Sequence, residues 1–214
     1  MVNETTIKRG SAAKRMKKKH LKNICVYCGA NAGAHPAYTE AARTLGREMA
    51  KKGIGLVYGG ASVGLMGEIA SAVLEGGGRV TGVIPAKLPT NEVPLSNIQE
   101  LIHVDTFHER KMIMFQRSDA FVALPGGVGT LEELVEQITW VQLAHHTKPV
   151  VIANIENYWQ PLLTLFNQMR SLKFIPPSLD VTYHVAERAQ EIIPLLLGLP
   201  ERDILREAPN IEAL

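Results

Sequence analysis

The chain has 214 residues, of which 46% are hydrophobic and 21% are charged, with 18 glycines and 12 prolines. These values are typical of one globular domain with a full hydrophobic core, and they exclude a chain that is disordered throughout. Two cysteines are too few for a disulfide scaffold, and no apolar run reaches the ~20 residues of a membrane helix, so we expect a cytoplasmic protein without a membrane partner.

The net charge of +2 conceals a basic N-terminal tail. Residues 1–22 hold eight lysines and arginines but a single acid, Glu4, and the rest of the chain, with 15 basic and 20 acidic residues, carries about −5. Such a tail can bind nucleic acid or an anionic surface electrostatically. Because it contains no aromatic residue that would stack on bases, we favour a solvated, disordered arm and do not expect nucleic acid as a partner.

After the tail, short apolar segments rich in β-formers alternate with longer segments of helical periodicity. This alternation predicts βαβ units and an α/β fold with a mainly parallel central sheet. The expected strands are Ile24–Cys28, Ile54–Tyr58, Val80–Ile84, Ile98–Val104, Ala120–Leu124 and Pro149–Ala153. The expected helices are Pro36–Lys52, Leu65–Leu74, Phe107–Arg117, Thr130–Leu143, Tyr158–Met169 and Val185–Leu196. We therefore divide the chain into the tail (1–22), one domain (23–198) and a C-terminal appendage (199–214).

Two glycine-rich loops follow expected strands. One spans Tyr58–Gly67 (YGGASVGLMG) and the other Pro125–Thr130 (PGGVGT). Ligands of open parallel sheets bind at the carboxyl ends of strands, and glycines let consecutive N–H groups converge on an anion at the start of the next helix. Each loop alone fits a tight strand-to-helix turn equally well. Two of them in one sheet, the second closed by the hydroxyl of Thr130, favour a phosphate site.

The familiar nucleotide motifs do not fit these loops. Neither loop carries the Gly-Lys-Ser/Thr of a P-loop, and Cys28–Gly33 (CGANAG) has its glycines misplaced for a dinucleotide fingerprint. The second strand also lacks a terminal acid that would bind a ribose diol. We therefore expect a mononucleotide or a sugar phosphate rather than NAD or ATP.

Charged residues stand close to the second glycine loop. Glu132 and Glu133 lie about 100° apart around their helix, so one can face solvent while the other faces the crevice. A carboxylate beside a phosphosugar can stabilise positive charge at the anomeric carbon or orient the attacking water. Arg110 and Lys111 follow a neighbouring strand and can bind an anionic substrate. The simpler alternatives are a favourable helix dipole for the acids and a solvated helix face for the basic pair.

Pro125–Glu133 matches the motif P-G-G-x-G-T-x-x-E, and Arg110-Lys111 matches the upstream R-K element, of the Lonely Guy (LOG) family. The chain thus resembles the cytokinin riboside 5′-monophosphate phosphoribohydrolases, once widely mislabelled as lysine decarboxylases, from about Asn23 to at least Asn154. The resemblance implies a Rossmann-like, three-layer homodimer without a cofactor. It implies hydrolysis of the N-glycosidic bond of an N6-modified AMP, or of AMP itself, to a free base and ribose 5-phosphate.

The same resemblance implies roles for individual residues. Arg110 and Glu133 become the catalytic pair. The implied substrate contacts are Gly59, Gly60, Glu92, Lys111, Gly126, Gly127, Val128, Gly129, Thr130, Leu131, Glu132 and Thr139. Phe107 stands where many members have Met, and we expect it to alter the base pocket; Val128 stands where plant members often have Tyr.

A second class of function uses the same crevice: a carrier or sensor that binds a nucleotide or related phosphate ligand without turning it over. Glu133 together with Arg110 favours the enzyme, because a carboxylate near a phosphate is unfavourable unless it serves another purpose.

No metal is expected from the remaining candidate ligands. Cys25 and Cys28 have zinc-like spacing, but residues three apart on a strand face opposite sides, so we expect buried thiols. His145 and His146 follow a helix, where we expect them at the surface as caps.

Overall fold

The computed structural model describes residues 21–86, 95 and 97–200. Most of the expected tail, Glu92 and the appendage beyond Pro200 lie outside the described residues. Leu21 is described and is buried in the core, and the backbone N–H of Lys22 donates to Asp119 at 2.7 Å. These two residues, which the sequence assigned to the tail, pack onto the folded domain.

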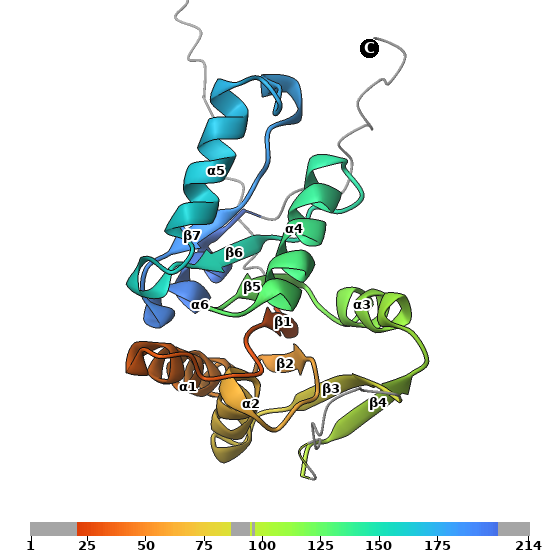
Figure 1. Cartoon of the computed structure of the whole chain (residues 1–214). Coiled ribbons are helices and arrows are strands. Elements are labelled where there is room, and N and C mark those ends of the chain that lie inside the picture. Colours follow the sequence, from red (N-terminus) through yellow and green to blue (C-terminus); the bar gives the residue numbers. More distant parts are fainter. Residues whose placement is uncertain (1–20, 87–94, 96, 201–214) are drawn as a thin grey trace, which may run out of the picture.

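The described residues form a seven-stranded, entirely parallel sheet in the order β4-β3-β2-β1-β5-β6-β7 (Figure 1). Its strands are β1 (Asn23–Tyr27), β2 (Gly55–Tyr58), β3 (Val80–Pro85), β4 (Glu100–Val104), β5 (Ala120–Ala123), β6 (Val150–Ala153) and β7 (His184–Ala186). β1 lies at the centre, with Ile24 paired to Leu56 on one side and to Ala120 on the other. The expected parallel sheet is confirmed.

Helices cover both faces of the sheet, which makes three layers (Figure 1). One face carries α1 (Pro36–Lys51), α2 (Gly64–Glu75) and α6 (Ala189–Gly198), and the other carries α3 (Phe107–Gln116), α4 (Val128–Gln142) and α5 (Gln160–Ser171). Within the described part of the chain, no helix combines the length and apolarity needed to cross a bilayer.

Side chains along β1 alternate between the two cores. Ile24 and Val26 belong to the core beneath α1 and α2, whereas Tyr27 belongs to the core beneath α3 and α4. Cys25 and Cys28 are buried in opposite cores as free thiols, which confirms that they do not face one another.

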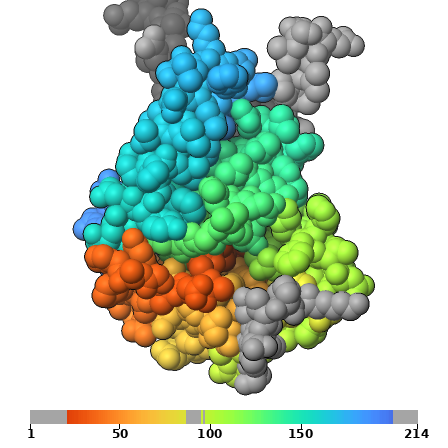
Figure 2. Space-filling model, viewed as in Figure 1, coloured from red at the N-terminus to blue at the C-terminus, as the bar shows by residue number. Residues whose placement is uncertain are grey.

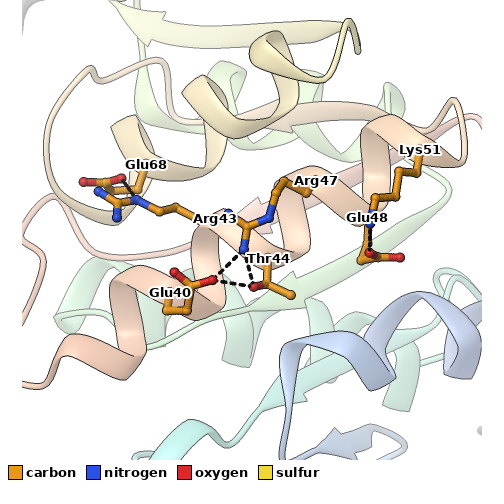
Figure 3. Close-up of polar contacts among 7 residues, drawn as sticks. All are labelled: Glu40, Arg43, Thr44, Arg47, Glu48, Lys51 and Glu68. Carbon is orange, nitrogen blue, oxygen red and sulfur yellow. Dashed lines mark hydrogen bonds and ion pairs between the residues drawn. The ribbon is translucent and has the colours of Figure 1, made fainter.

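α1 and α2 pack closely at Gly46. A Cβ at this position would lie 2.7 Å from the carbonyl oxygen of Ile69 and 2.8 Å from the Cβ of Ala72, so only glycine fits without displacing α2. At the rim of this contact, Arg43 of α1 pairs with Glu68 of α2 at 2.6 Å, while the other ion pairs in Figure 3 lie within α1. Exposed ion pairs contribute little, so close packing holds the two helices together.

The predicted helix Val185–Leu196 is wrong at its start. β7 comes first and pairs with β6, and α6 begins only at Ala189. The carboxylate of Glu191 accepts hydrogen bonds from the backbone N–H groups of the two residues before Ala189, both at 3.2 Å, and this defines where the helix begins. A three-residue edge strand is too short to produce a periodicity distinct from that of the apolar helix that follows it.

Candidate active site

The site lies where the order of the strands reverses. From β1 the chain runs outward to β4 and then returns to β5, on the other side of β1. Ligands in open α/β sheets bind at the carboxyl ends of the strands at such a point. The loops after β1 and β5 are joined there, because the N–H of Gly29 donates to the carbonyl of Pro125 at 3.1 Å. Figure 2 shows the segment after β1 and the start of α4 meeting on one face, and a cavity of about 490 Å³ opens between them.

The order of the strands separates the two ends of the cavity, because Arg110 contacts Val83 of β3 whereas Tyr158 follows β6, with β1 and β5 between them. One end lies under α3, and its walls are Arg110, Glu133 and four apolar residues: Met66, Pro85, Phe107 and Met114. At the other end, Tyr38 from α1 and Tyr158 from the β6–α5 connection lie against one another, with their ring centroids 5.6 Å apart. The two ends therefore differ in chemistry: one is charged and apolar, and the other is aromatic.

Arg110 and Glu133 form a largely buried ion pair. Arg110 Nη1 donates to Glu133 Oε1 at 2.9 Å, and the two side chains are 15% and 11% exposed. Arg110 Nε also donates to the carbonyl oxygen of Val83 at 3.0 Å, which anchors the guanidinium to β3. Burial raises the pKa of Glu133, and the charge of Arg110 opposes part of that rise. The arrangement presents one oriented carboxylate to the cavity.

The neighbouring carboxylate points elsewhere. Glu132 is 54% exposed and pairs with Lys111 at 2.6 Å, whereas Glu133 lines the cavity. Lys111 also pairs with Glu136 at 2.8 Å, so it ties α3 to α4 outside the cavity. The expectation that the two adjacent glutamates face different directions is confirmed.

The glycine loop presents the start of α4 to the cavity. Gly127 is the N-cap of this helix, and its first turn has no side-chain cap. The first N–H groups of a helix have no partner within the helix, and the helix dipole adds positive character there. Gly126, Gly127, Gly129 and Thr130 all line the cavity, which makes this end of α4 suitable for a phosphate group.

The structure brings together only part of the set of residues implied by the resemblance. The cavity is lined by Gly59, Arg110, Gly126, Gly127, Gly129, Thr130 and Glu133. Six others lie outside its lining: Gly60, Lys111, Val128, Leu131, Glu132 and Thr139. Glu92 is not among the described residues. Val128 is 83% exposed, and the hydroxyl of Thr139 donates to the carbonyl of Val135 in its own helix at 2.7 Å.

Several cavity residues carry no signal in the sequence. Tyr38, Tyr158, Pro85 and Met114 belong to no glycine loop or charged motif, whereas Met66 lies in the first glycine-rich loop. Tyr158 could have been found by examining the segment after β6, since that strand also ends at this edge of the sheet. Phe107, which the sequence singled out for the base pocket, does line the cavity.

The expectation of a surface cap at His146 is wrong. His146 is only 9% exposed and packs against the rings of Phe115, Phe121 and Trp140. The left-handed backbone of Ala144 (φ 58°) turns the chain back beneath α4. Burial lowers the pKa of His146 to about 4. Across the described ranges, no cluster of three or more His, Cys, Asp or Glu side chains is arranged to hold a metal ion.

Comparison with known proteins places the chain among related sequences. A family model described as "Possible lysine decarboxylase" matches residues 66–196. The cytokinin riboside 5′-monophosphate phosphoribohydrolase LOG7 of Arabidopsis thaliana is 46% identical over 176 residues, which cover 82% of this chain and 81% of the relative. The probable cytokinin riboside 5′-monophosphate phosphoribohydrolase LOGL1 of Oryza sativa subsp. japonica is 48% identical over 170 residues, which cover 79% and 76%.

Solved structures share the architecture at lower identity. The molybdenum cofactor binding protein from Rippkaea orientalis has a TM-score of 0.62 at 24% identity, over 83% of this chain and 96% of that one. The molybdenum cofactor carrier protein from Chlamydomonas reinhardtii has a TM-score of 0.62 at 23% identity, over 84% and 100%. At these identities the likeness shows the fold alone.

Proposed function

The chain belongs to the family of cytokinin riboside 5′-monophosphate phosphoribohydrolases (LOG), and from this membership we propose that it hydrolyses the N-glycosidic bond of N6-modified AMP, or of AMP itself. The products are a free base and ribose 5-phosphate. The observation that carries the proposal is the buried ion pair of Arg110 and Glu133, one helical turn beyond a glycine loop at the start of α4.

The spacing along α4 suits a ribose 5-phosphate. The phosphate binds the N–H groups of the first turn, where the helix dipole favours an anion. From Val128 to Glu133 the helix rises about 7 Å, which is comparable with the length of a ribose 5-phosphate. The anomeric carbon of the bound sugar then lies near the carboxylate, and the base extends toward the apolar end under α3.

Glu133 acts on the water and on the charge that develops in the sugar. Water adds to the anomeric carbon while the carbon–nitrogen bond breaks, and the base leaves with the bonding electrons and takes up a proton. The carboxylate stabilises the oxocarbenium-like state or accepts a proton from the water, and the rise in its pKa caused by burial makes it a stronger base for that second role. Arg110 holds the carboxylate in a fixed orientation.

We also propose that the protein is a homodimer. Val128, Val135 and Leu143 lie exposed on the outward side of α4, and Met112 lies exposed on the adjacent α3. An apolar stripe of this kind is typical of a surface covered by a partner. Val128, Glu132 and Thr139 lie outside the lining of their own cavity. Their spacing puts them on the same face of α4 as Val135, so in the proposed dimer they lie at the contact between the subunits.

A cytoplasmic location is part of the proposal. Both cysteines are buried and free, which fits a reducing compartment. The proposed reaction needs water as its only co-reactant, so no cofactor is invoked.

The test is to incubate the purified protein with AMP and, separately, with isopentenyladenosine monophosphate, and to follow the free base by chromatography. Glu133→Gln keeps the shape and removes the charge, and we expect it to lower turnover ~10²-fold or more. Glu48→Gln, on the solvent face of α1, is the matched control (Figure 3). Nucleotide binding without release of base from the wild type would favour a carrier or sensor instead.

A further inference from the structure

Two tyrosines that no motif marks form one wall of the cavity. The hydroxyl of Tyr158 donates to the carbonyl oxygen of Gly126 in the glycine loop. The ring of Tyr38 meets that of Tyr158 edge-on, at an interplanar angle of 75°. Tyr38 in turn packs on the loop after β1, because a Cβ at Gly33 would lie 2.9 Å from its ring. The pair therefore joins α1, the loop after β1 and the glycine loop at the end of the cavity opposite Arg110.

The hydrogen bond of Tyr158 fixes a peptide group that precedes the anion-binding turn. The carbonyl of Gly126 and the N–H of Gly127 belong to one planar peptide unit and point in opposite directions. Flanked by two glycines, this unit has access to more backbone conformations than any other pair of residues would allow. By holding the carbonyl oxygen, Tyr158 also sets the direction of the Gly127 N–H at the start of α4.

The two residues directly before Tyr158 adopt an unfavourable backbone conformation. Glu156 and Asn157, directly before it, both have left-handed φ values of 52° and 58°. Non-glycine residues seldom adopt this region, and such positions concentrate at functional sites. The buried Asn154 holds the turn, because its Oδ1 accepts the backbone N–H of Trp159 at 2.8 Å. The connection is thus kept in a shape that places Tyr158 at the cavity.

The number of positively charged side chains around the cavity limits the number of phosphate groups that a ligand can place in it. Among the described residues that line it, Arg110 is the sole cation, and it is anchored to β3, whereas Tyr158 follows β6 on the other side of β1 and β5. A single phosphate is met by the N–H groups of the first turn of α4. A second phosphate would extend toward two aromatic rings, and no lysine or arginine among the described lining residues stands beside them.

We propose that Tyr38 and Tyr158 close the phosphate end of the site, with Tyr158 as a positioning residue for the glycine loop, and that this wall selects a terminal 5′-monophosphate over a diphosphate. The inference rests on the proposed function, because it places the 5′-phosphate of the substrate at residues 126–129. Tyr38 and Tyr158 are the two side chains that distinguish a monophosphate from a diphosphate, and this can be tested by ligand binding as well as by turnover.

The first experiment removes the hydroxyl of Tyr158. Tyr158→Phe should raise the KM for AMP and the inhibition constant of inorganic phosphate by the same factor, about two- to tenfold, as expected for one neutral hydrogen bond. The value of kcat should stay close to that of the wild type, because the lost interaction is made equally in the ground state and the transition state. Cleavage of adenosine, which has no phosphate, should not change. Tyr183→Phe, whose ring packs on Phe166 rather than at the cavity, is the control.

The second experiment opens the wall. Tyr38→Ala should narrow the preference for AMP over ADP, measured as the ratio of their kcat/KM values. An unchanged KM for AMP in Tyr158→Phe, an equal loss for adenosine and AMP, or an unchanged AMP/ADP ratio in Tyr38→Ala would overturn the inference.

Failure of the proposed function can be told apart from failure of the inference. If the wild type binds AMP but releases no base, calorimetric titration with AMP, ADP and inorganic phosphate replaces the kinetic constants. A selective loss of phosphate affinity in Tyr158→Phe would then uphold the inference while the hydrolytic function fails. Hydrolysis of AMP that Tyr158→Phe leaves unaltered would refute the inference alone.

Discussion

Gly59 leaves the space that the guanidinium of Arg110 occupies. A Cβ at Gly59 would overlap Nη2 of Arg110 and would lie 2.9 Å from Sδ of Met66. The glycine at the end of β2 belongs to a loop that the sequence marks for phosphate, yet its contact in the fold is with an arginine. Its lack of a side chain is what lets Arg110 reach both Val83 and Glu133.

Gly59→Ala should therefore impair catalysis more than folding. The added methyl group displaces the guanidinium from Glu133, and misplacing a catalytic group by about 1 Å lowers activity on the order of 10²-fold. The measurement is kcat/KM for AMP alongside the melting temperature. Gly198→Ala, where an added Cβ meets no atom within 4 Å, should leave both unchanged. Full activity in Gly59→Ala would show that Arg110 needs no such space.

The pH dependence of the reaction should report the burial of Glu133. The carboxylate must be ionised to act, and burial raises its pKa above the ~4.3 of an ordinary glutamate. The acid limb of the kcat/KM profile should therefore lie above that value. Because the charge of Arg110 lowers the pKa, Arg110→Met should move the limb of its residual activity to higher pH. A limb at or below the ordinary glutamate range would contradict this assignment.

Glu133 should also affect stability, in a direction set by its raised pKa. Between the unfolded and folded pKa values, the native state binds more protons than the unfolded state, so the free energy of unfolding falls as pH rises through that range. Glu133→Gln removes this titration and should gain stability relative to the wild type on going from pH 4 to pH 7. Urea unfolding of both proteins across this range tests the sign. A constant difference would show that the carboxyl group titrates alike in both states.

The titration of His146 should make stability depend on pH in the direction opposite to that of Glu133. Burial lowers its pKa from 6.5 to about 4, so the unfolded state binds more protons between these values. The protein should lose roughly 3 kcal/mol of stability from this group as pH falls from 6.5 to 4. His146→Leu should flatten that loss, although removing the acceptor of the Lys148 N–H lowers its stability at pH 7. His145→Gln, at an exposed neighbouring position, should keep the slope of the wild type.

The contact between α1 and α2 should depend on Gly46. Gly46→Val drives its side chain into the backbone at Ile69 and into Ala72, and overpacking of this kind costs about 1–3 kcal/mol. Arg43→Ala, which removes the exposed pair with Glu68, should have a much smaller effect. Chemical unfolding of the two variants compares the contributions of packing and of surface charge at one interface. Equal losses in the free energy of unfolding would refute the conclusion that packing contributes more than the ion pair.

The local patterns of the sequence predicted the parallel sheet except for its edge strand β7, the helices except for the start of α6, and the residues that follow the strands at the site. Alternation of apolar segments predicted the parallel layers, and Pro125–Glu133 marked the start of α4 together with Glu133 itself. These features depend on backbone geometry and side-chain periodicity within a few residues. The sequence analysis did not predict the short edge strand β7, because its apolar residues are continuous with those of α6.

The sequence by itself determined which residues carry the charge and which loops can approach an anion. Only the tertiary structure decided that Lys111 and Thr139 lie outside the cavity, that His146 is buried, and that Tyr38 and Tyr158 meet at the glycine loop. The physical reason is distance along the chain. The direction a side chain takes from its helix, and the remote partner it meets, are set by packing between elements that are tens of residues apart and share no local pattern.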